Sequence, residues 1–478
     1  SNSNKIKKTK TQGGDKMKRF WALAIAIAAL TVWTVPALAE VKFGGEYRLR
    51  AESWDGYNFS DDETKNDSIA YYGQRVRLTG VATPTDDTTV KITIQDSRTW
   101  GETTSLSGDI YGPTGTDTEN TYIDLHESFL QINNLFGAPI ALKVGRQELV
   151  YGDQRLIGSF GWSNNGRSFD ALKLMYSNDM VNVDAFTAKI WDDNAHYSWS
   201  TTPSPDDVDD DIDFHGIYAT IKSIPNNTLD VYALLYREGW QAGTTASEIS
   251  TDLRTYGVRL AGAVVGVDYT AELPIQKGEV DCGATTLCDV DALAYAIKVG
   301  YTIPNNALGL RVGAEYDYAS GSDTTSTDPN PDMETFVNLY PTNHDKYGYM
   351  DQQGWRNMKA WNINVSAKPI AKLGVRLDYW NFTLADDSDG WYNAAGNATG
   401  LRASGCTITA TGENCGDKMG SEIDLTANYK YNDAVSIQAG ISRFFAGSGL
   451  EDRVQKYYAL TDDAEDMDWM YVQISANF

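Results

Sequence analysis

The sequence has little proline, little cysteine and, beyond its first forty residues, no long apolar run. Proline occurs 13 times and cysteine four times among 478 residues. No segment after residue 40 approaches the roughly 18 consecutive apolar residues of a transmembrane helix, which excludes membrane crossing by helices there. Linkers rich in serine or proline are also missing. We therefore expect residues 40–478 to form one continuous domain.

Histidine is scarce as well. The four histidines, His126, His196, His215 and His344, have a spacing that fits neither a metal site nor a Ser-His-Asp triad. We therefore expect no enzymatic activity, no cofactor and no nucleic-acid partner.

The first 39 residues contain the one strongly apolar segment. Basic residues at 16, 18 and 19 precede an apolar stretch at 21–35, and small residues follow at 36–39. This order predicts a secretory signal peptide at residues 17–39, with residues 1–16 as an upstream extension. An uncleaved N-terminal membrane helix is the alternative, which the short apolar stretch and the cleavage site disfavour.

Glycine and aromatic residues are abundant, with 42 Gly, 28 Tyr and 13 Trp. Both suit strands, tight turns and the aromatic belts of membrane barrels. About eighteen segments alternate apolar and polar residues with the period of a β-strand, and each has the length of a tilted membrane strand. They are 41–52, 69–83, 88–99, 122–133, 139–149, 168–177, 180–191, 213–224, 227–237, 252–262, 264–273, 290–303, 307–319, 357–369, 372–384, 419–431, 433–445 and 465–478.

The connections between these segments alternate in length. Short turns occur at 84–87, 178–179, 225–226, 304–306 and 432–433. Long connections separate them at about 53–68, 100–121, 150–167, 192–212, 238–251, 274–289, 320–356, 385–418 and 446–464. Short periplasmic turns and long outer loops in alternation predict an all-β transmembrane antiparallel barrel in the Gram-negative outer membrane. A soluble β-sandwich or propeller is the alternative, but it has no reason to alternate loop lengths in this way.

The last segment supports an outer-membrane location. Apolar residues at 470, 472, 474, 476 and 478 alternate with others, and the chain ends on Phe478. A closing strand that ends in phenylalanine resembles the assembly signal of Gram-negative outer-membrane barrels. We expect the barrel assembly machinery to bind Phe478, and we expect the barrel to contact outer-membrane lipid and lipopolysaccharide as a monomer.

Charged residues within the strands follow the phase opposite to the apolar ones, so they should face the lumen. A charged interior must be hydrated, and about eighteen strands leave room for an aqueous channel. Rows of arginine in such a channel guide anions, whereas the alternative is that each cation pairs with a carboxylate as a strut across the wall. The predicted pore-lining cations in strands are Arg48, Arg50, Arg75, Arg77, Lys143, Arg259, Arg311 and Arg376.

Acidic residues concentrate in the predicted outer loops of a chain whose formal net charge is −25. A solvated rim is the favoured interpretation. A divalent cation site is a weak alternative because clustered carboxylates suit Ca²⁺ but no EF-hand spacing is present. Its candidate ligands are Asp206, Asp207, Asp209, Asp210 and Asp211.

The four cysteines form two close pairs in predicted outer loops. The pairs are Cys282 with Cys288 and Cys406 with Cys415. In a chain that passes the oxidising periplasm, two local disulfides are expected. A zinc site is the alternative, which the spacing fits poorly.

Several motifs resemble the alginate export family of outer-membrane barrels. They are the segment from Gly145 to Gly158, the segment 162–170, the segment from Tyr340 to Gly348 that leads to Asp351, and residues 420–425 with 444–447. The resemblance implies an eighteen-stranded barrel whose Arg- and Lys-lined pore passes an anionic polysaccharide. It adds Arg155 to the pore lining and implies that Arg75, Arg77, Arg146 and Arg167 form the selectivity region.

Two kinds of channel remain open. An exporter of an alginate-like polysaccharide is the first expectation. An ungated porin for uptake of small anionic solutes is the alternative, because the turn at 432–433 is short where exporters of this family carry a long periplasmic turn that plugs the pore. A surface-binding barrel and an outer-membrane enzyme are the remaining classes.

Overall fold

The computed structural model describes residues 40–60, 68–101, 123–192, 211–241, 248–283, 286–323, 332–398, 402, 415–458 and 464–478. Several predictions lie outside these residues. They are the signal peptide at 17–39, the upstream extension at 1–16, Cys406, His196 and the aspartates Asp206, Asp207, Asp209 and Asp210.

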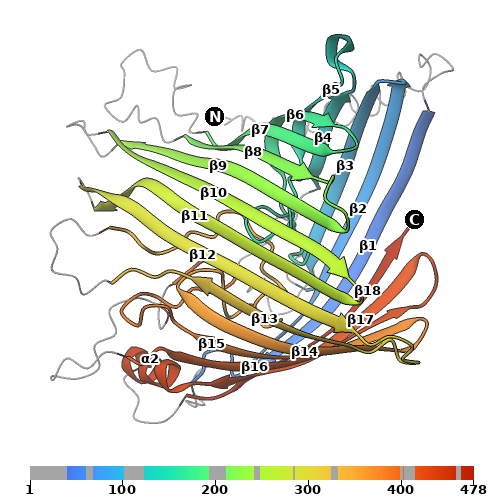
Figure 1. The fold of residues 1–478 in the computed structure, drawn as a ribbon. Coiled ribbons are helices and arrows are strands. Elements are labelled where there is room, and N and C mark those ends of the chain that lie inside the picture. The colour runs from blue at the N-terminus through green and yellow to red at the C-terminus, as the bar shows by residue number, and fades with distance from the viewer. Residues whose placement is uncertain are drawn as a thin grey trace, which may run out of the picture.

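The described residues form a closed antiparallel β-barrel of eighteen strands (Figure 1). Each strand pairs with its neighbours in sequence, and β1 closes the barrel by pairing with β18. This confirms the predicted fold class and strand number. The strands are β1 (Glu40–Asp55), β2 (Ile69–Thr85), β3 (Thr88–Thr99), β4 (Asp124–Ile132), β5 (Ile140–Gln147), β6 (Phe169–Ser177), β7 (Val181–Trp191), β8 (Ile212–Ile221), β9 (Asn227–Gln241), β10 (Glu248–Val264), β11 (Val267–Gly283), β12 (Thr286–Thr302), β13 (Arg311–Ala319), β14 (Met358–Ile370), β15 (Leu373–Thr383), β16 (Lys418–Lys430), β17 (Val435–Ala446) and β18 (Met467–Asn477).

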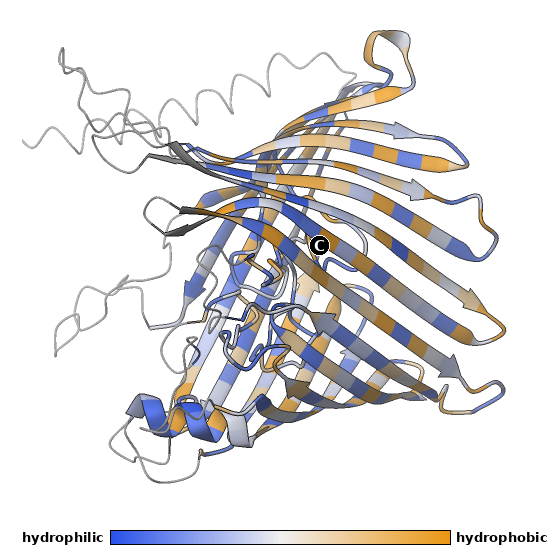
Figure 2. Cartoon of the chain, turned by 60° about the vertical axis from the view of Figure 1, so that its left-hand side comes forward, coloured by the Kyte–Doolittle hydropathy of each residue, from blue (hydrophilic) through white to orange (hydrophobic). Residues whose placement is uncertain are grey.

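Side chains alternate between an apolar outer face and a polar and aromatic inner face (Figure 2). On β18, Met470 and Val472 are 57% and 56% exposed, whereas Trp469 and Tyr471, which alternate with them, are buried. In a soluble protein, aliphatic side chains are buried and polar ones are exposed. Here the aliphatic side chains are exposed and many polar ones are buried, as a barrel wall that faces lipid requires.

All connections at one end of the barrel are short, and the longest of them covers residues 303–310. The other end carries the long connections, as predicted. Two predicted loops are wrong, however, because residues 238–241, 248–251, 274–283 and 286–289 belong to strands. There β11 and β12 continue with exposed charged residues such as Lys277 and Asp289 on the outer face. The hydrogen-bonded ladder therefore extends beyond the apolar band. Alternation of apolar and polar residues cannot predict the strands there, because their outer face is no longer apolar.

The described residues also include two short helices. The 3-10 helix η1 (Leu135–Gly137) lies in a short turn, and α2 (Ser448–Tyr458) lies at the end that carries the long connections (Figure 1). α2 was not predicted. It buries Leu450 and Val454, which are four residues apart and so share one helix face. Among the described residues, no helix is long and apolar enough to cross a membrane.

The chain terminus is part of the barrel closure. The Phe478 carbonyl accepts a hydrogen bond from Gly45 N at 2.8 Å, and Phe478 N donates back to Gly45 O at 3.1 Å. A Cβ atom added at Gly45 would lie 2.5 Å from the Phe478 ring. Glycine at this position therefore lets the terminal ring pack directly against β1.

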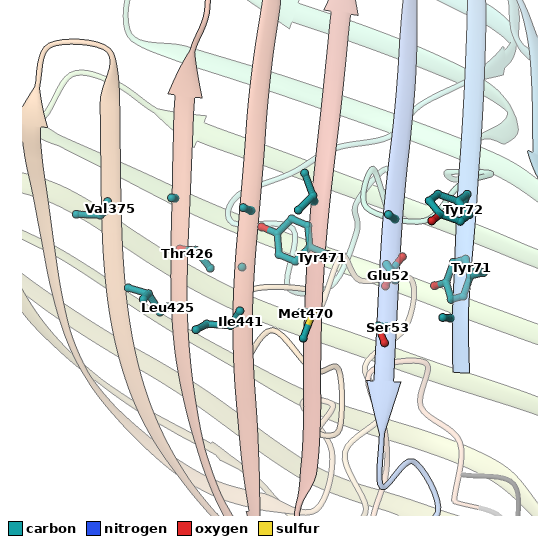
Figure 3. Close-up of a pocket in the computed structure, with 16 residues that line it drawn as sticks. Glu52, Ser53, Tyr71, Tyr72, Val375, Leu425, Thr426, Ile441, Met470 and Tyr471 are labelled. Carbon is teal, nitrogen blue, oxygen red and sulfur yellow. The ribbon is translucent and has the colours of Figure 1, made fainter. Parts of the chain in front are cut away.

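The outer face also has a groove of about 500 Å³ over β16, β17, β18, β1 and β2 (Figure 3). Small side chains such as Ala51, Ala427 and Ala439 form its floor, and Ile441 and Met470 stand beside it. Because these residues belong to the apolar outer face, the groove opens toward the lipid side of the wall.

Candidate functional site: a constriction inside the barrel

Two long connections fold back into the barrel and meet there. We call residues 148–168, between β5 and β6, the first luminal loop. We call residues 320–323 and 332–357, between β13 and β14, the second luminal loop. Chain segments inside the barrel are visible in Figure 2. Ile157 and Tyr340 form a parallel bridge. Gly158 N donates to Tyr340 O and Tyr340 N donates to Leu156 O, both at 2.9 Å. We call this meeting point the constriction.

The arginines of β1 and β2 hold the first luminal loop. Arg48 donates to the carbonyl oxygens of Gly161 and Ser163 at 2.8 and 2.9 Å, and Arg75 donates to the same two oxygens at 3.1 and 3.0 Å. Arg50 donates to the carbonyl of Trp162 at 2.7 Å. All three arginines are buried. They are therefore covered by the loop that they bind.

Arg77 and Arg167 extend this positive cluster. Arg77 donates to Gln95 at 2.7 Å. Arg167 donates to the carbonyl of Pro341 in the second luminal loop at 2.7 Å, and no described carboxylate pairs with it. Burial lowers the pKa of Arg167 to about 10. We call Arg48, Arg50, Arg75, Arg77 and Arg167 the constriction arginines.

Three carboxylates lie among the constriction arginines. Glu46, Glu52 and Glu148 have an oxygen 2.7, 2.6 and 3.8 Å from an arginine nitrogen of the cluster. The five arginines therefore have three carboxylates as ion-pair partners, and Glu127 is a further acidic neighbour of Arg77. The cluster thus keeps an excess of positive charge. In a lumen with low-dielectric walls, such an excess attracts anions.

Buried ion pairs tie the first luminal loop to the wall formed by β10 and β13. Arg155 of the loop pairs with Glu315 and Asp317 of β13, with 3.2 Å to Asp317. Arg259 of β10 pairs with Asp153 of the loop. Breaking one member of a buried pair leaves an uncompensated charge, which is strongly unfavourable. The loop is thus fixed to β1 and β2 by one set of contacts and to β10 and β13 by another.

An aromatic stack lies where the two luminal loops meet. The rings of Trp162 and His344 are 3.8 Å apart and nearly parallel, with an interplanar angle of 8°. The Arg50 guanidinium lies 3.7 Å from the centroid of the Trp162 ring. His344 Nδ1 is 3.0 Å from Asp351. A cation, an indole and an imidazole therefore share one stack that joins β1 to both loops.

Two cavities adjoin the constriction. The vestibule, of about 700 Å³, lies toward the long connections and includes Trp54, Tyr57, Phe160, Asp351, Arg402 and Tyr457 in its lining. The lower cavity, of about 420 Å³, reaches toward the short turns and includes Trp162, His344, Tyr349, Lys368, Arg376 and Tyr471.

The other predicted pore-lining cations lie apart from this cluster. The Lys143 ammonium is 3.8 Å from the Phe129 ring centroid. The remaining three have carboxylate partners: Arg146 with Asp170 at 3.1 Å, Arg311 with Asp268 at 2.5 Å and Arg376 with Asp378 at 2.6 Å. For Arg311 and Arg376 these contacts match the strut alternative in geometry. Arg146 and Asp170 instead share the outer face of β5 and β6 with the exposed Val144 and Leu172, so Arg146 does not line the pore as predicted. A role in guiding anions stays a prediction for the other members of the set.

The other candidate residues are described only in part. Cys288 and Cys415 are disulfide-bonded, and the predicted pairing of each with its near neighbour stays a prediction. Asp211 accepts a hydrogen bond from Lys189 at 2.5 Å. Within the described ranges, no group of three side chains suits a metal ion.

Sequence reasoning missed the aromatic stack and a polar cluster beside it. His126 of β4 lies 2.8 Å from Glu148 of the first luminal loop, although spacing alone suggested no role for any histidine. Trp162 and His344 are 182 positions apart. The sequence feature that could have indicated this contact is that both residues lie in segments that resemble the same family.

A closed barrel with an apolar outer face and a constricted, charged lumen is an integral outer-membrane channel. The model of the alginate export family matches residues 39–459 of the sequence. The chain therefore belongs to the alginate export family. No curated protein matches the sequence.

Solved structures share the fold. OprD of Pseudomonas aeruginosa superposes with a TM-score of 0.54 at 11% identity, over 92% of this chain and 93% of that chain. OpdO of the same organism gives 0.54 at 11% identity, over 92% and 97%. OccK8 (OprE), also of that organism, gives 0.53 at 11% identity, over 92% and 98%. At these identities the likeness establishes the barrel architecture alone.

Proposed function

We propose that this outer-membrane channel passes anionic solutes and that an anionic polysaccharide moving outward is its main substrate. The observation that carries the proposal is the charge of the constriction, where five arginines have three carboxylates as ion-pair partners. Membership of the alginate export family supports the polysaccharide.

The constriction arginines would act through their field and not by direct contact. Arg48, Arg50 and Arg75 are buried behind the first luminal loop, and their N–H groups bind its carbonyl oxygens. This arrangement neutralises the negative ends of the backbone dipoles and leaves the positive charge near the solute path. A carboxylate in the lumen is then stabilised without being trapped in a tight ion pair, which conduction requires.

Uptake of small anionic solutes is the second candidate. Trp162 and His344 join the two luminal loops across the constriction, so an extended chain could pass only if this stack separated. In addition, no connection at the short-turn end is long enough to form a plug; the turn between β16 and β17 covers residues 431–434. A small carboxylate needs neither an opening step nor a periplasmic gate.

The test is ion selectivity and polymer passage in planar lipid bilayers. Under a salt gradient, the reversal potential should show anion preference. A polyuronate chain should then produce resolved current blocks that shorten as the voltage driving it rises, because passage ends each block, whereas a neutral glucan of equal length should produce few. Cation preference would contradict both candidates. Blocks that lengthen with voltage, together with permeation of monomeric uronates, would favour uptake.

We further propose that the protein is a monomer without enzymatic activity. Its outer face would contact lipid and lipopolysaccharide, and its C-terminal Phe478, which is 69% exposed, would be the element that the barrel assembly machinery binds. Removal of Phe478 should lower the yield of inserted barrel in outer membranes, while a Phe478→Tyr variant should insert normally.

A further inference from the structure

The vestibule contains a cation, Arg402, that pairs with no carboxylate of the described part of the chain. The Arg402 guanidinium lies 3.6 Å from the centroid of the Trp391 ring, which is fully buried. Two of its N–H groups donate to Gln352, one of them to the backbone carbonyl at 2.9 Å. No carboxylate of the described residues pairs with it, and burial lowers the pKa of Arg402 to about 9. Arg402 is therefore protonated near neutral pH and poorly hydrated, and it has no counter-ion among the residues that the structure describes.

Aromatic rings line the same cavity and are open to solvent. Tyr57 and Tyr457 are 47% and 55% exposed, and they come from β1's outer connection and from α2. Trp54 meets Tyr57 edge to face, with ring centroids 5.9 Å apart. Exposed rings around a water-filled cavity provide flat apolar surfaces, and the C–H face of a pyranose packs on such surfaces.

A path of aromatic contacts leads from the vestibule to the constriction. The Trp54 and Trp469 centroids are 5.2 Å apart, those of Trp469 and Tyr471 are 4.8 Å apart, and Tyr471 lies 5.0 Å from Trp162. A solute held in the vestibule is thus adjacent to the stack that closes the constriction.

We propose that the vestibule is a separate binding site for a carboxylated sugar ring, in which Arg402 binds the carboxylate and Tyr57, Trp54 and Tyr457 pack against the ring. The proposal rests on the proposed function, because it gives the anionic solute a docking point outside the constriction. Arginine suits this task because its planar N–H groups match a carboxylate in geometry as well as charge.

The test is calorimetric titration of the full-length protein in detergent. The three probes are a uronic acid tetramer, a neutral glucose tetramer and sodium acetate. The tetramer of uronic acid should bind more tightly than either of the others. Arg402→Gln should weaken its binding about tenfold, the effect of losing one charged hydrogen-bonding group. Arg254→Gln is the matched control, since Arg254 lies at the same end, is half-exposed and pairs with Asp252.

The outcomes separate cleanly. Unchanged binding by a folded Arg402→Gln protein would overturn the site, and so would an equal loss in Arg254→Gln. Acetate that binds as tightly as the uronate tetramer would overturn the sugar ring as ligand. If Arg402→Gln yields no folded barrel, Tyr57→Ala decides, and unchanged affinity there overturns the proposal. The reversal potential of the unmodified channel tests the proposed function separately, because it does not depend on binding in the vestibule.

Discussion

Some charged residues of the lumen have two roles: they contribute to the electrostatic field, and they bind the first luminal loop. Arg50 shows both, because it pairs with Glu52, donates to the Trp162 carbonyl and lies against the Trp162 ring. A substitution there would change the field and release the loop together. Residues that perform one task are therefore better probes, and Trp162 is one of them because it carries no charge.

Trp162→Ala should increase the single-channel conductance. The ring fills lumen between Arg50 and His344, and its removal widens the narrowest part by most of an indole, so we expect an increase of about twofold. Trp361→Ala is the control, because Trp361 lies on the lipid-facing side of β14 and is 38% exposed. Equal conductance in wild type and Trp162→Ala would show that the solute path does not pass this stack.

At the scale of elements, the strands and the luminal loops are stabilised in different ways. The strands are held by a ladder that closes on itself, so no single side chain supports the wall. The first luminal loop instead depends on a few side-chain contacts at each side of the lumen, chiefly Arg48 and Arg75 on one side and Arg155 on the other. Displacement of the first luminal loop and unfolding of the barrel wall should therefore be independent events.

Arg155→Ala should release the first luminal loop while the barrel stays closed. The change leaves Glu315 and Asp317 buried without their cation, which costs about 3–5 kcal/mol in comparable buried pairs. We expect larger and noisier single-channel currents but an unchanged heat-modifiable band on gels. Arg146→Ala, which breaks the half-exposed pair with Asp170, should change neither. Loss of the folded band in Arg155→Ala would show that the loop supports the wall.

The strands could be predicted from sequence because each one repeats a simple period of two over a lipid-facing band. The ends of β11 and β12 could not, since beyond that band Lys277 and Asp289 no longer mark an apolar face. The direction of the luminal loops was equally hidden. Arg48 binds carbonyl groups more than a hundred residues away, and a backbone carbonyl has no sequence signature. The inward direction of Arg48 and Arg75 could be predicted from the strand period, whereas the partners of these arginines could not.

At the scale of the whole molecule, the disulfide-bonded cysteines lie beyond the apolar band of the wall, with Cys288 in the extended part of β12 and Cys415 in the connection before β16. Cys288 and Cys415 are both disulfide-bonded near the end that carries the long connections. Reduction with dithiothreitol should leave the heat-modifiable band intact, because a bridge that closes a short loop contributes at most about 2–3 kcal/mol. A shift of that band to the unfolded position after reduction alone would show that the bridges support the wall as well.

The net charge of the molecule and the charge of its constriction have opposite signs, and only one of them can set selectivity. The chain carries −25 overall, yet the constriction has an excess of arginine. One charge in the constriction and a permeating ion about 10 Å away have an interaction energy of about 1–2 kcal/mol at an effective dielectric constant of about 20. At the open mouth, water reduces the same interaction to about 0.4 kcal/mol, and salt at about 0.1 M screens it further.

Arg77→Gln combined with Arg167→Gln should therefore shift the reversal potential toward cations more than neutralisation of the five aspartates of segment 206–211, which the sequence predicts in an outer loop. Both arginine changes keep a side chain that can donate to the present acceptors, Gln95 and the Pro341 carbonyl, so the loops should stay in place.

The comparison variant replaces Asp206, Asp207, Asp209, Asp210 and Asp211 with asparagine. Reversal potentials of both variants at about 0.1 M and about 1 M salt decide the matter, because the aspartate effect should vanish at the higher salt and the arginine effect should persist. A larger shift from the aspartates at both concentrations would mean that the acidic mouth governs permeation, and the anion channel would then have to be abandoned.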